Sequence, residues 1–263
     1  MSLQGRGLPR PEYGMNPALA KTSHRPWPMP SSPWVMAQCW HDLLFAHWPC
    51  AAAELRALVP PALEIDLYEK QAWLGVIPFR MSGVRLRATP PLPWLSGFTE
   101  LNVRSYVVKD GKPGVWFFSL DAANPIAVAI ARAWFSLPYF RARMSCELYD
   151  NGILYSSERT HRGAPAASLR CSYRPAGPAF EPQPGSFEHF LTERYCLYAA
   201  DLRGQLFRGE IQHPPWSLQF AEAEITSNTM AQAAGLALPS AKPLLHFSKL
   251  QQMVAWSPER LPS

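Results

Sequence analysis

The chain has 263 residues, of which 48% are hydrophobic and 17% charged, a composition that supports a sizeable core and excludes a mainly disordered protein. This length fits one large domain, and single β-barrel domains reach it. The net charge of +5 comes from 19 arginines against 6 lysines that are scattered rather than massed, so we expect no nucleic-acid partner.

The first 33 residues contain seven prolines among polar residues, which predicts a tail or wrapping arm rather than a folded element. From Trp34 onward, aromatic and β-branched runs alternate with turn signals, and no repeat period is present. We therefore expect one domain over residues 34–257 and a short C-terminal tail over 258–263.

The first half of this domain reads as a short helix followed by hairpins. Residues 51–58 predict a helix that ends before Pro60 and Pro61. A hairpin is expected from 64–68 and 72–81, and a proline-rich loop follows. The Asp110-Gly111 pair predicts a second hairpin, because this dipeptide favours a tight turn between the strands 98–108 and 114–120.

The second half predicts more strands and short helices. Asn124 and Pro125 are typical of a helix start, so we expect a helix to about residue 135, and Ser186 predicts the cap of another. A loop is expected at 175–185 and a third helix at 228–234. Further strands are expected at 141–149, 153–160, 167–173, 195–201, 205–212, 216–225 and 244–256. This pattern favours a mainly β protein, an antiparallel sandwich or barrel with a few short helices.

One predicted strand carries a polar face. Alternation of side chains places Glu100, Asn102, Arg104 and Tyr106 on the same side, with Glu100 and Arg104 about 13 Å apart at roughly 3.3 Å per residue. Two interpretations are open. The polar face meets solvent, as one side of an antiparallel sheet usually does, or it lines a barrel interior and contacts a ligand.

Two other charged positions have structural and functional interpretations. Arg80 interrupts an apolar strand, so its charge requires a partner, a ligand or an exit to water. Glu193 and Arg194 are neighbours of opposite charge at a helix-to-strand junction, which favours a structural ion pair.

No cofactor or metal site is indicated. The seven histidines show no paired spacing, and the five cysteines are widely spaced, which is typical of reduced thiols. Phosphate-binding glycine loops and recognised nucleophile motifs are also missing from the sequence. Because no apolar run of about 18 to 20 residues and no signal-peptide pattern are present, we expect a cytoplasmic protein without membrane contact.

Eight motifs occur in an order that resembles the YqjF-like family, which is grouped with the acetoacetate decarboxylase superfamily: LLFAHWP, WLGVIPFRM, ELNVRSYV, GVWFFSLDA, LPYFRARM, HFLTERYCLY, GEIQHPPW and LLHFSK. The resemblance covers about residues 34–257. It implies a cone-shaped β-barrel with a cavity, and it makes a homo-oligomer plausible.

The resemblance also identifies a departure from decarboxylase chemistry. In the decarboxylases an Arg-Glu pair is followed by Pro-Lys-Lys, and the first lysine forms a Schiff base. Here Arg132 and Pro138 keep the spacing, but Ala133 replaces the glutamate, and Tyr139 and Phe140 replace the lysines. A phenol cannot form an imine, so the matching position lacks the covalent nucleophile.

Three functions follow as alternatives. The first is a barrel that binds a small organic acid or carbonyl compound, with catalysis open and, if present, of acid–base type; its site candidates are Glu100, Tyr139, Arg104, Asn102, Arg80 and Tyr106. Among these, Tyr139 and Glu100 are the catalytic candidates and Arg104 the carboxylate ligand. The second is a lysine-dependent lyase that uses a relocated lysine such as Lys249. The third is an interaction or structural protein whose cavity is filled by aromatic side chains.

Overall fold

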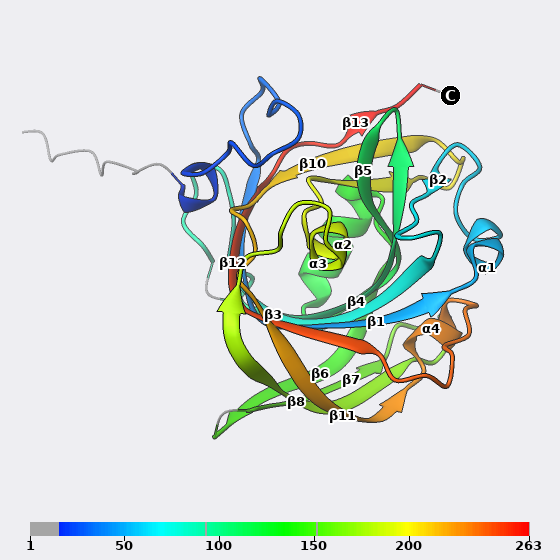
Figure 1. Ribbon diagram of the computed structural model, residues 1–263. Helices are drawn as coiled ribbons and strands as arrows, with labels where there is room; N and C mark the ends of the chain where they lie inside the picture. Colours follow the sequence, from blue (N-terminus) through cyan, green and yellow to red (C-terminus); the bar gives the residue numbers. More distant parts are fainter. Residues whose placement is uncertain (1–15, 93, 151, 263) are drawn as a thin grey trace, which may run out of the picture.

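The computed structural model describes residues 16–92, 94–150 and 152–262 (Figure 1). Its strands are β1 Met36–Cys50, β2 Glu64–Ile65, β3 Ala72–Leu86, β4 Phe98–Lys109, β5 Lys112–Ala122, β6 Tyr139–Tyr149, β7 Gly152–Arg159, β8 Ser168–Phe180, β9 Cys196–Ala200, β10 Leu206–Gln212, β11 Leu218–Asn228, β12 Leu244–Ala255 and β13 Glu259–Arg260. The helices are η1 Pro17–Leu19, α1 Ala52–Arg56, α2 Pro125–Phe135, α3 Phe187–Thr192 and α4 Met230–Ala233. The mainly β class expected from the sequence is confirmed.

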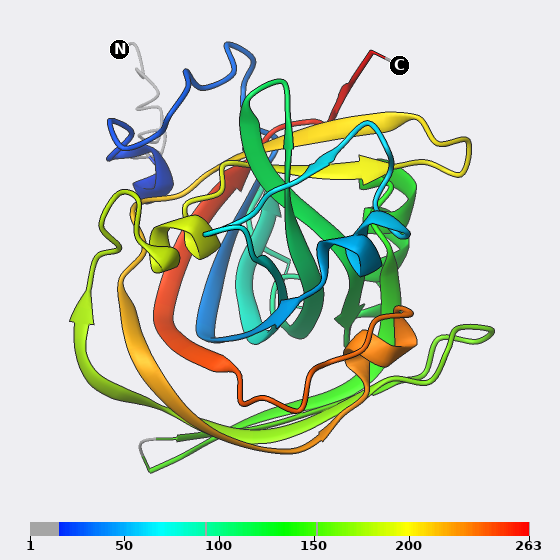
Figure 2. The same cartoon turned by 45° about the vertical axis from the view of Figure 1, so that its right-hand side comes forward.

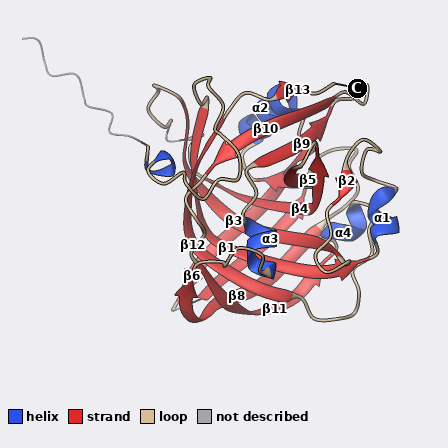
Figure 3. Ribbon diagram, turned by 45° about the horizontal axis from the view of Figure 1, so that its top comes forward, coloured by secondary structure: helices blue, strands red, loops and turns tan. Residues whose placement is uncertain are grey.

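The strands form one sheet that closes on itself twice. A nine-strand ring runs through β5, β6, β7, β8, β11, β12, β1, β3 and β4. A seven-strand ring leaves β5 through β9 and β10 and rejoins at β12, so that both rings share the wall β12-β1-β3-β4-β5. Figure 2 shows β12, β1 and β3 side by side in this wall, and Figure 3 shows the strands that surround it.

Alternation along the shared wall sends every second side chain into each ring. On β4, Leu101 and Val103 join the main core of the nine-strand ring, whereas Glu100, Asn102 and Arg104 face the seven-strand ring. The nine-strand ring is filled by large buried side chains, among them Leu44, Trp48, Tyr155, Tyr173 and Phe247. The seven-strand ring instead encloses a cavity.

The hairpin between β4 and β5 is confirmed. Lys109 pairs with Lys112 across Asp110 and Gly111, whose φ angles are 53° and 70°. Two positive φ angles give the turn a twist that matches the strands, which is why Asp-Gly favours this hairpin. The turn fixes the register of β4 with β5 as far as Arg104 and Phe117, and a bulge at Phe118 then shifts it by one residue, so that Glu100 pairs with Ala122.

The expected hairpin of 64–68 with 72–81 is wrong. Glu64 pairs with Val108 of β4, and β3 pairs with β1 and with the first half of β4. β3 pairs with β4 only between Gly75 and Met81, which leaves the second half of β4 without β3 beside it. β2 pairs there instead, at Val107 and Val108. Only the bridge between Tyr68 and Gln71 remains of the expected hairpin.

The expected loop at 175–185 is wrong in its first half, because β8 continues through Phe180. Beyond Tyr173, β8 pairs with β11 but no longer with β7 among the described residues. An edge position tolerates proline, since the missing N–H faces away from the neighbour. Pro175, which pairs with Ala221, therefore fits inside a strand.

Two strand pairs are parallel rather than antiparallel, β5 with β6 and β5 with β9. The first follows from α2, which begins as expected at the Asn124 cap and carries the chain back so that β6 runs alongside β5. This crossover brings Tyr139, the first residue of β6, beside Leu120. Tyr139 is therefore separated from β4 by a single strand, β5.

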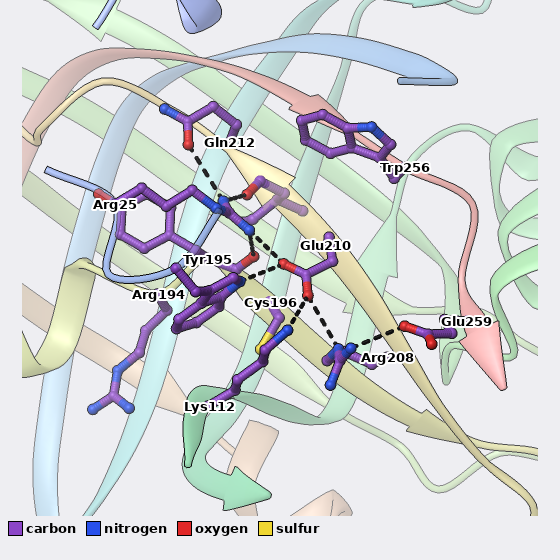
Figure 4. A network of polar contacts seen from close by, with 12 residues as sticks. Arg25, Lys112, Arg194, Tyr195, Cys196, Arg208, Glu210, Gln212, Trp256 and Glu259 are labelled. Carbon is purple, nitrogen blue, oxygen red and sulfur yellow. Dashed lines mark hydrogen bonds and ion pairs between the residues drawn. The ribbon is translucent and has the colours of Figure 1, made fainter. Parts of the chain in front are cut away.

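The described part of the proline-rich segment packs against the domain through Arg25. The Arg25 guanidinium pairs with the carboxylate of Glu210 on β10, which Trp27 also contacts through an indole N–H at 2.8 Å. Lys112 and Arg208 complete the network at 3.4 and 3.1 Å (Figure 4). One buried carboxylate thus joins the segment to β5 and β10.

Candidate functional site

The cavity of about 550 Å³ lies inside the seven-strand ring. One end is closed by buried side chains: Thr192 at the end of α3, Arg194 after it, and His213 after β10. At the other end the lining side chains are exposed, and they come from α2 and residues 84–92: Leu86, Thr89, Pro90, Leu92, Ile130 and Trp134. The cavity is therefore a blind tunnel with an apolar mouth.

Glu100 and Tyr139 form the central polar pair of the tunnel. The Tyr139 hydroxyl donates to Oε2 of Glu100 at 2.8 Å, and only 3% of Glu100 is exposed. Burial raises the pKa of Glu100 to about 8, although the Tyr139 hydrogen bond acts in the opposite direction. Burial also raises the pKa of Tyr139 well above its usual value. The pair therefore holds a protonated carboxyl group near neutral pH.

Arg104 provides a cation near the closed end. Its guanidinium donates to the Leu191 carbonyl at 3.2 Å and lies over the rings of Phe45 and Tyr106. Within the described residues, no carboxylate pairs with Arg104, and its Nε atom has no hydrogen-bond partner. The buried Oδ1 atom of Asn102 likewise has no partner there. Both side chains have hydrogen-bonding capacity that the described protein groups leave unused.

Arg194 and His213 also line the closed end, and sequence reasoning did not select them. Arg194 pairs with Asp66 rather than with its neighbour Glu193, which instead accepts hydrogen bonds from the Tyr195 hydroxyl and a backbone N–H. Burial lowers the pKa of His213, so its imidazole is neutral. In the sequence, the only feature that pointed to either residue was the charge of Arg194 at a helix-to-strand junction.

Of the predicted site residues, the structure brings four into the tunnel wall: Glu100, Asn102, Arg104 and Tyr139. The solvent-facing interpretation of this β4 face is wrong, because Glu100 and Asn102 are buried. Their contact with a ligand stays a prediction.

Arg80 and Tyr106 lie outside the tunnel lining. The neighbours of Arg80 on β3, Phe79 and Met81, line the tunnel, so the Arg80 side chain points to the opposite side of the strand, where it pairs with Asp42. Tyr106 shares the face of Glu100 but lies beyond the closed end, where Phe190 covers it and His47 lies 2.6 Å from its hydroxyl. The prediction from the sequence had both side chains contact a ligand, but neither lines the tunnel.

Lysines are missing from the described lining of the tunnel. Lys249 on β12 is 70% exposed and bonds to Asp42 at 2.6 Å, on the same side of the wall as Arg80. Searched over residues 16–92, 94–150 and 152–262, the chain has neither a group of three metal-binding side chains nor a helix long and apolar enough to span a bilayer.

Comparison with known proteins identifies relatives over most of the chain. The model of the DUF2071 family, described as an uncharacterized conserved protein, matches residues 37–252. Uncharacterized protein YqjF of Bacillus subtilis (strain 168) is 45% identical over 228 residues, which are 87% of this chain and 93% of that protein.

Solved structures show the same fold at low sequence identity. Acetoacetate decarboxylase from Legionella pneumophila superposes with a TM-score of 0.59 at 12% identity, covering 91% of this chain and 93% of that one. The enduracididine biosynthesis enzyme MppR, complexed with the condensation product of pyruvate and imidazole 4-carboxaldehyde, gives a TM-score of 0.61 at 9% identity, covering 87% and 90%. The chain therefore belongs to the DUF2071 family, is a homologue of YqjF, and has the fold of the acetoacetate decarboxylase-like enzymes.

Proposed function

We propose that this protein binds a small organic acid that carries a carbonyl group, with the carboxylate at Arg104 and the carbonyl oxygen near Glu100. The observation that supports this most is Arg104, a cation in the tunnel wall whose charge no carboxylate of the described residues neutralises. A guanidinium binds carboxylates through paired, charge-assisted hydrogen bonds.

The charge balance of the closed end supports an anionic ligand. Arg104 and Arg194 contribute two positive charges, and Asp66 contributes one negative charge. Burial keeps His213 neutral and raises the pKa of Glu100 to about 8. Arg194 therefore has a carboxylate partner in Asp66, whereas Arg104 has none among the described residues, and a ligand carboxylate would supply one.

The pair of Glu100 and Tyr139 supports acid–base chemistry on such a ligand. A protonated Glu100 can donate its proton to a carbonyl oxygen, and the Tyr139 hydroxyl then stabilises the carboxylate that remains. Imine chemistry has less support, because the described tunnel wall offers no lysine amine to attack the carbonyl carbon.

The ligands of structural neighbours agree with this class of compound. MppR has been solved with pyruvate and with a condensation product of pyruvate, both held in a protein of this fold. At 9–10% identity the neighbours support the type of ligand and not its identity.

Calorimetric titration of the full chain with pyruvate, 2-oxobutyrate and 2-oxohexanoate tests the proposal. We expect saturable binding that Arg104→Ala weakens by about 10- to 100-fold, as loss of a charged hydrogen bond of about 1.5–3 kcal/mol implies. Arg80→Ala is the matched control, since Arg80 lies outside the tunnel. Equal affinity of wild type and Arg104→Ala, or no binding by any acid, would refute the proposal.

A further inference from the structure

The mouth of the tunnel differs from its closed end in chemistry. Exposed apolar side chains surround the opening, with Leu86 and Leu92 46% and 45% exposed on one side and Ile130 and Trp134 45% and 44% exposed on the other. Buried apolar residues continue this surface inward, including Met81 and Phe135. An apolar wall thus runs from solvent to the polar groups of β4.

The size of the tunnel exceeds what a short acid fills. A volume of about 550 Å³ falls within the roughly 300–1,000 Å³ of pockets that enclose drug-sized ligands. Along β4 the lining extends from Phe98 to Arg104, about 20 Å at roughly 3.3 Å per residue. Glu100, Asn102 and Arg104 make about 13 Å of this length polar, and the apolar lining begins at Phe98 and continues outward to the mouth.

We propose that the ligand is an amphipathic acid, whose carboxylate binds Arg104 and whose extended apolar body lies between α2 and residues 84–92. This inference rests on the proposed function and specifies the substrate class of the same site. The polar end lies deepest because the closed end holds the unneutralised cation, and the apolar end leaves through the mouth because the lining there is apolar.

The opposite orientation of the ligand would place its carboxylate at a different arginine. Arg85 lines the tunnel near the mouth, with its guanidinium stacked over Trp34, and it could hold the carboxylate of a ligand inserted with its apolar end first. Arg104 is favoured because the deepest polar groups would otherwise face the apolar end of the ligand. The two arginines predict opposite outcomes in the same titration.

A series of acids with increasing numbers of carbons tests the inference. We would titrate the full chain with straight-chain 2-oxo acids of three, six, eight and ten carbons, below their micelle-forming concentrations. Affinity should rise with length by up to about fourfold per added methylene, because each buried methylene is worth about 0.8 kcal/mol. Arg104→Ala should weaken binding of every acid, whereas Arg85→Ala should not.

A matched pair of variants on α2 tests the path of the apolar body. Ala131 lines the tunnel and Ala133 is exposed on another face of α2. Ala131→Phe should narrow the mouth, weakening the ten-carbon acid at least tenfold while leaving the three-carbon acid unchanged. Ala133→Phe should leave both affinities unchanged.

The outcomes separate this inference from the proposed function. If short acids bind through Arg104 but added carbons bring no gain, the proposed function stands and the amphipathic ligand is refuted. Length-dependent binding that Ala131→Phe leaves intact, or that depends on Arg85 instead of Arg104, also refutes the inference. If no acid binds, the proposed function itself fails.

Discussion

The hydroxyl of Tyr139 donates a hydrogen bond to Glu100 at 2.8 Å, between two strands that both pair with β5. Glu100 belongs to β4 and Tyr139 begins β6 after the α2 crossover, so the contact depends on the parallel pairing of β5 with β6. Tyr155 donates to the backbone carbonyl of Glu100 from the other side of the wall, at 2.7 Å. The side chain and the backbone of Glu100 are therefore held from opposite sides of β4.

The raised pKa of Glu100 predicts a pH-dependent stability. Because the pKa is about 8 in the folded state and near 4.5 for an ordinary glutamate, the folded protein binds the extra proton between these values. The unfolding free energy should fall as pH rises from about 4.5 through 8, by up to about 1.4 kcal/mol per pH unit. Urea unfolding of wild type and Glu100→Gln at pH 5, 6.5 and 8 should show this slope in the difference between their unfolding free energies, since the buried histidines with lowered pKa contribute to both proteins alike. If the unfolding free energies of wild type and Glu100→Gln change with pH in the same way, Glu100 is ionised over the whole range from pH 5 to 8.

Tyr139→Phe should raise the pKa of Glu100 further. Burial is the main cause of the raised pKa, and the Tyr139 hydrogen bond partly offsets it by stabilising the carboxylate. Infrared titration of the protonated carboxyl band, identified by its loss in Glu100→Gln, should give a higher midpoint in Tyr139→Phe than in wild type. A lower midpoint would show that Tyr139 stabilises the protonated form instead.

Much of the wall could be predicted from the sequence because its signals are local. Period-two alternation grouped Glu100, Asn102 and Arg104, and Asp110-Gly111 gave the hairpin that fixes their register. The family resemblance indicated the fold and the position of Tyr139. These expectations depend on neighbours along the chain or on motif order.

The remaining features depend on contacts between distant segments. Alternation could not tell which face of β3 turns toward the cavity, so Arg80 was grouped with residues on the opposite side of the wall. Arg194 has its partner at Asp66, 128 residues away, whereas the sequence offered only Glu193 beside it. The second ring of the sheet closes through the pairing of β10 with β12, which no local sequence motif predicts.

Asp42 and Lys249 should differ sharply in their importance for stability. Burial would raise the pKa of Asp42, but hydrogen bonds from Lys249 and Arg80 outweigh it and lower the pKa. Asp42→Ala should reduce the unfolding free energy by about 1–3 kcal/mol, since it removes the buried carboxylate that accepts hydrogen bonds from both Arg80 and Lys249. Lys249→Ala should cost less than about 1 kcal/mol, because this side chain is 70% exposed. Denaturant unfolding measures both, and equal losses would contradict this assignment.

Glu210 should be the main link between the proline-rich segment and the domain. Glu210→Gln would leave Arg25, Lys112 and Arg208 close together without their shared carboxylate, so we expect a loss of about 3–5 kcal/mol and faster proteolysis within residues 16–33. The matched control is Glu259→Gln, whose carboxylate is 64% exposed and should contribute less than about 1 kcal/mol. Indistinguishable stabilities of the two variants would contradict the account.

The most direct test of the carboxylate site compares an acid with its uncharged amide in wild type and in Arg104→Ala. Calorimetric dissociation constants of 2-oxooctanoate and 2-oxooctanamide form a double cycle that isolates the interaction of Arg104 with the ligand charge. We expect wild type to prefer the acid by about 10- to 100-fold and the variant to lose most of that preference. An acid preference that remains unchanged in Arg104→Ala would contradict the claim that this guanidinium receives the carboxylate.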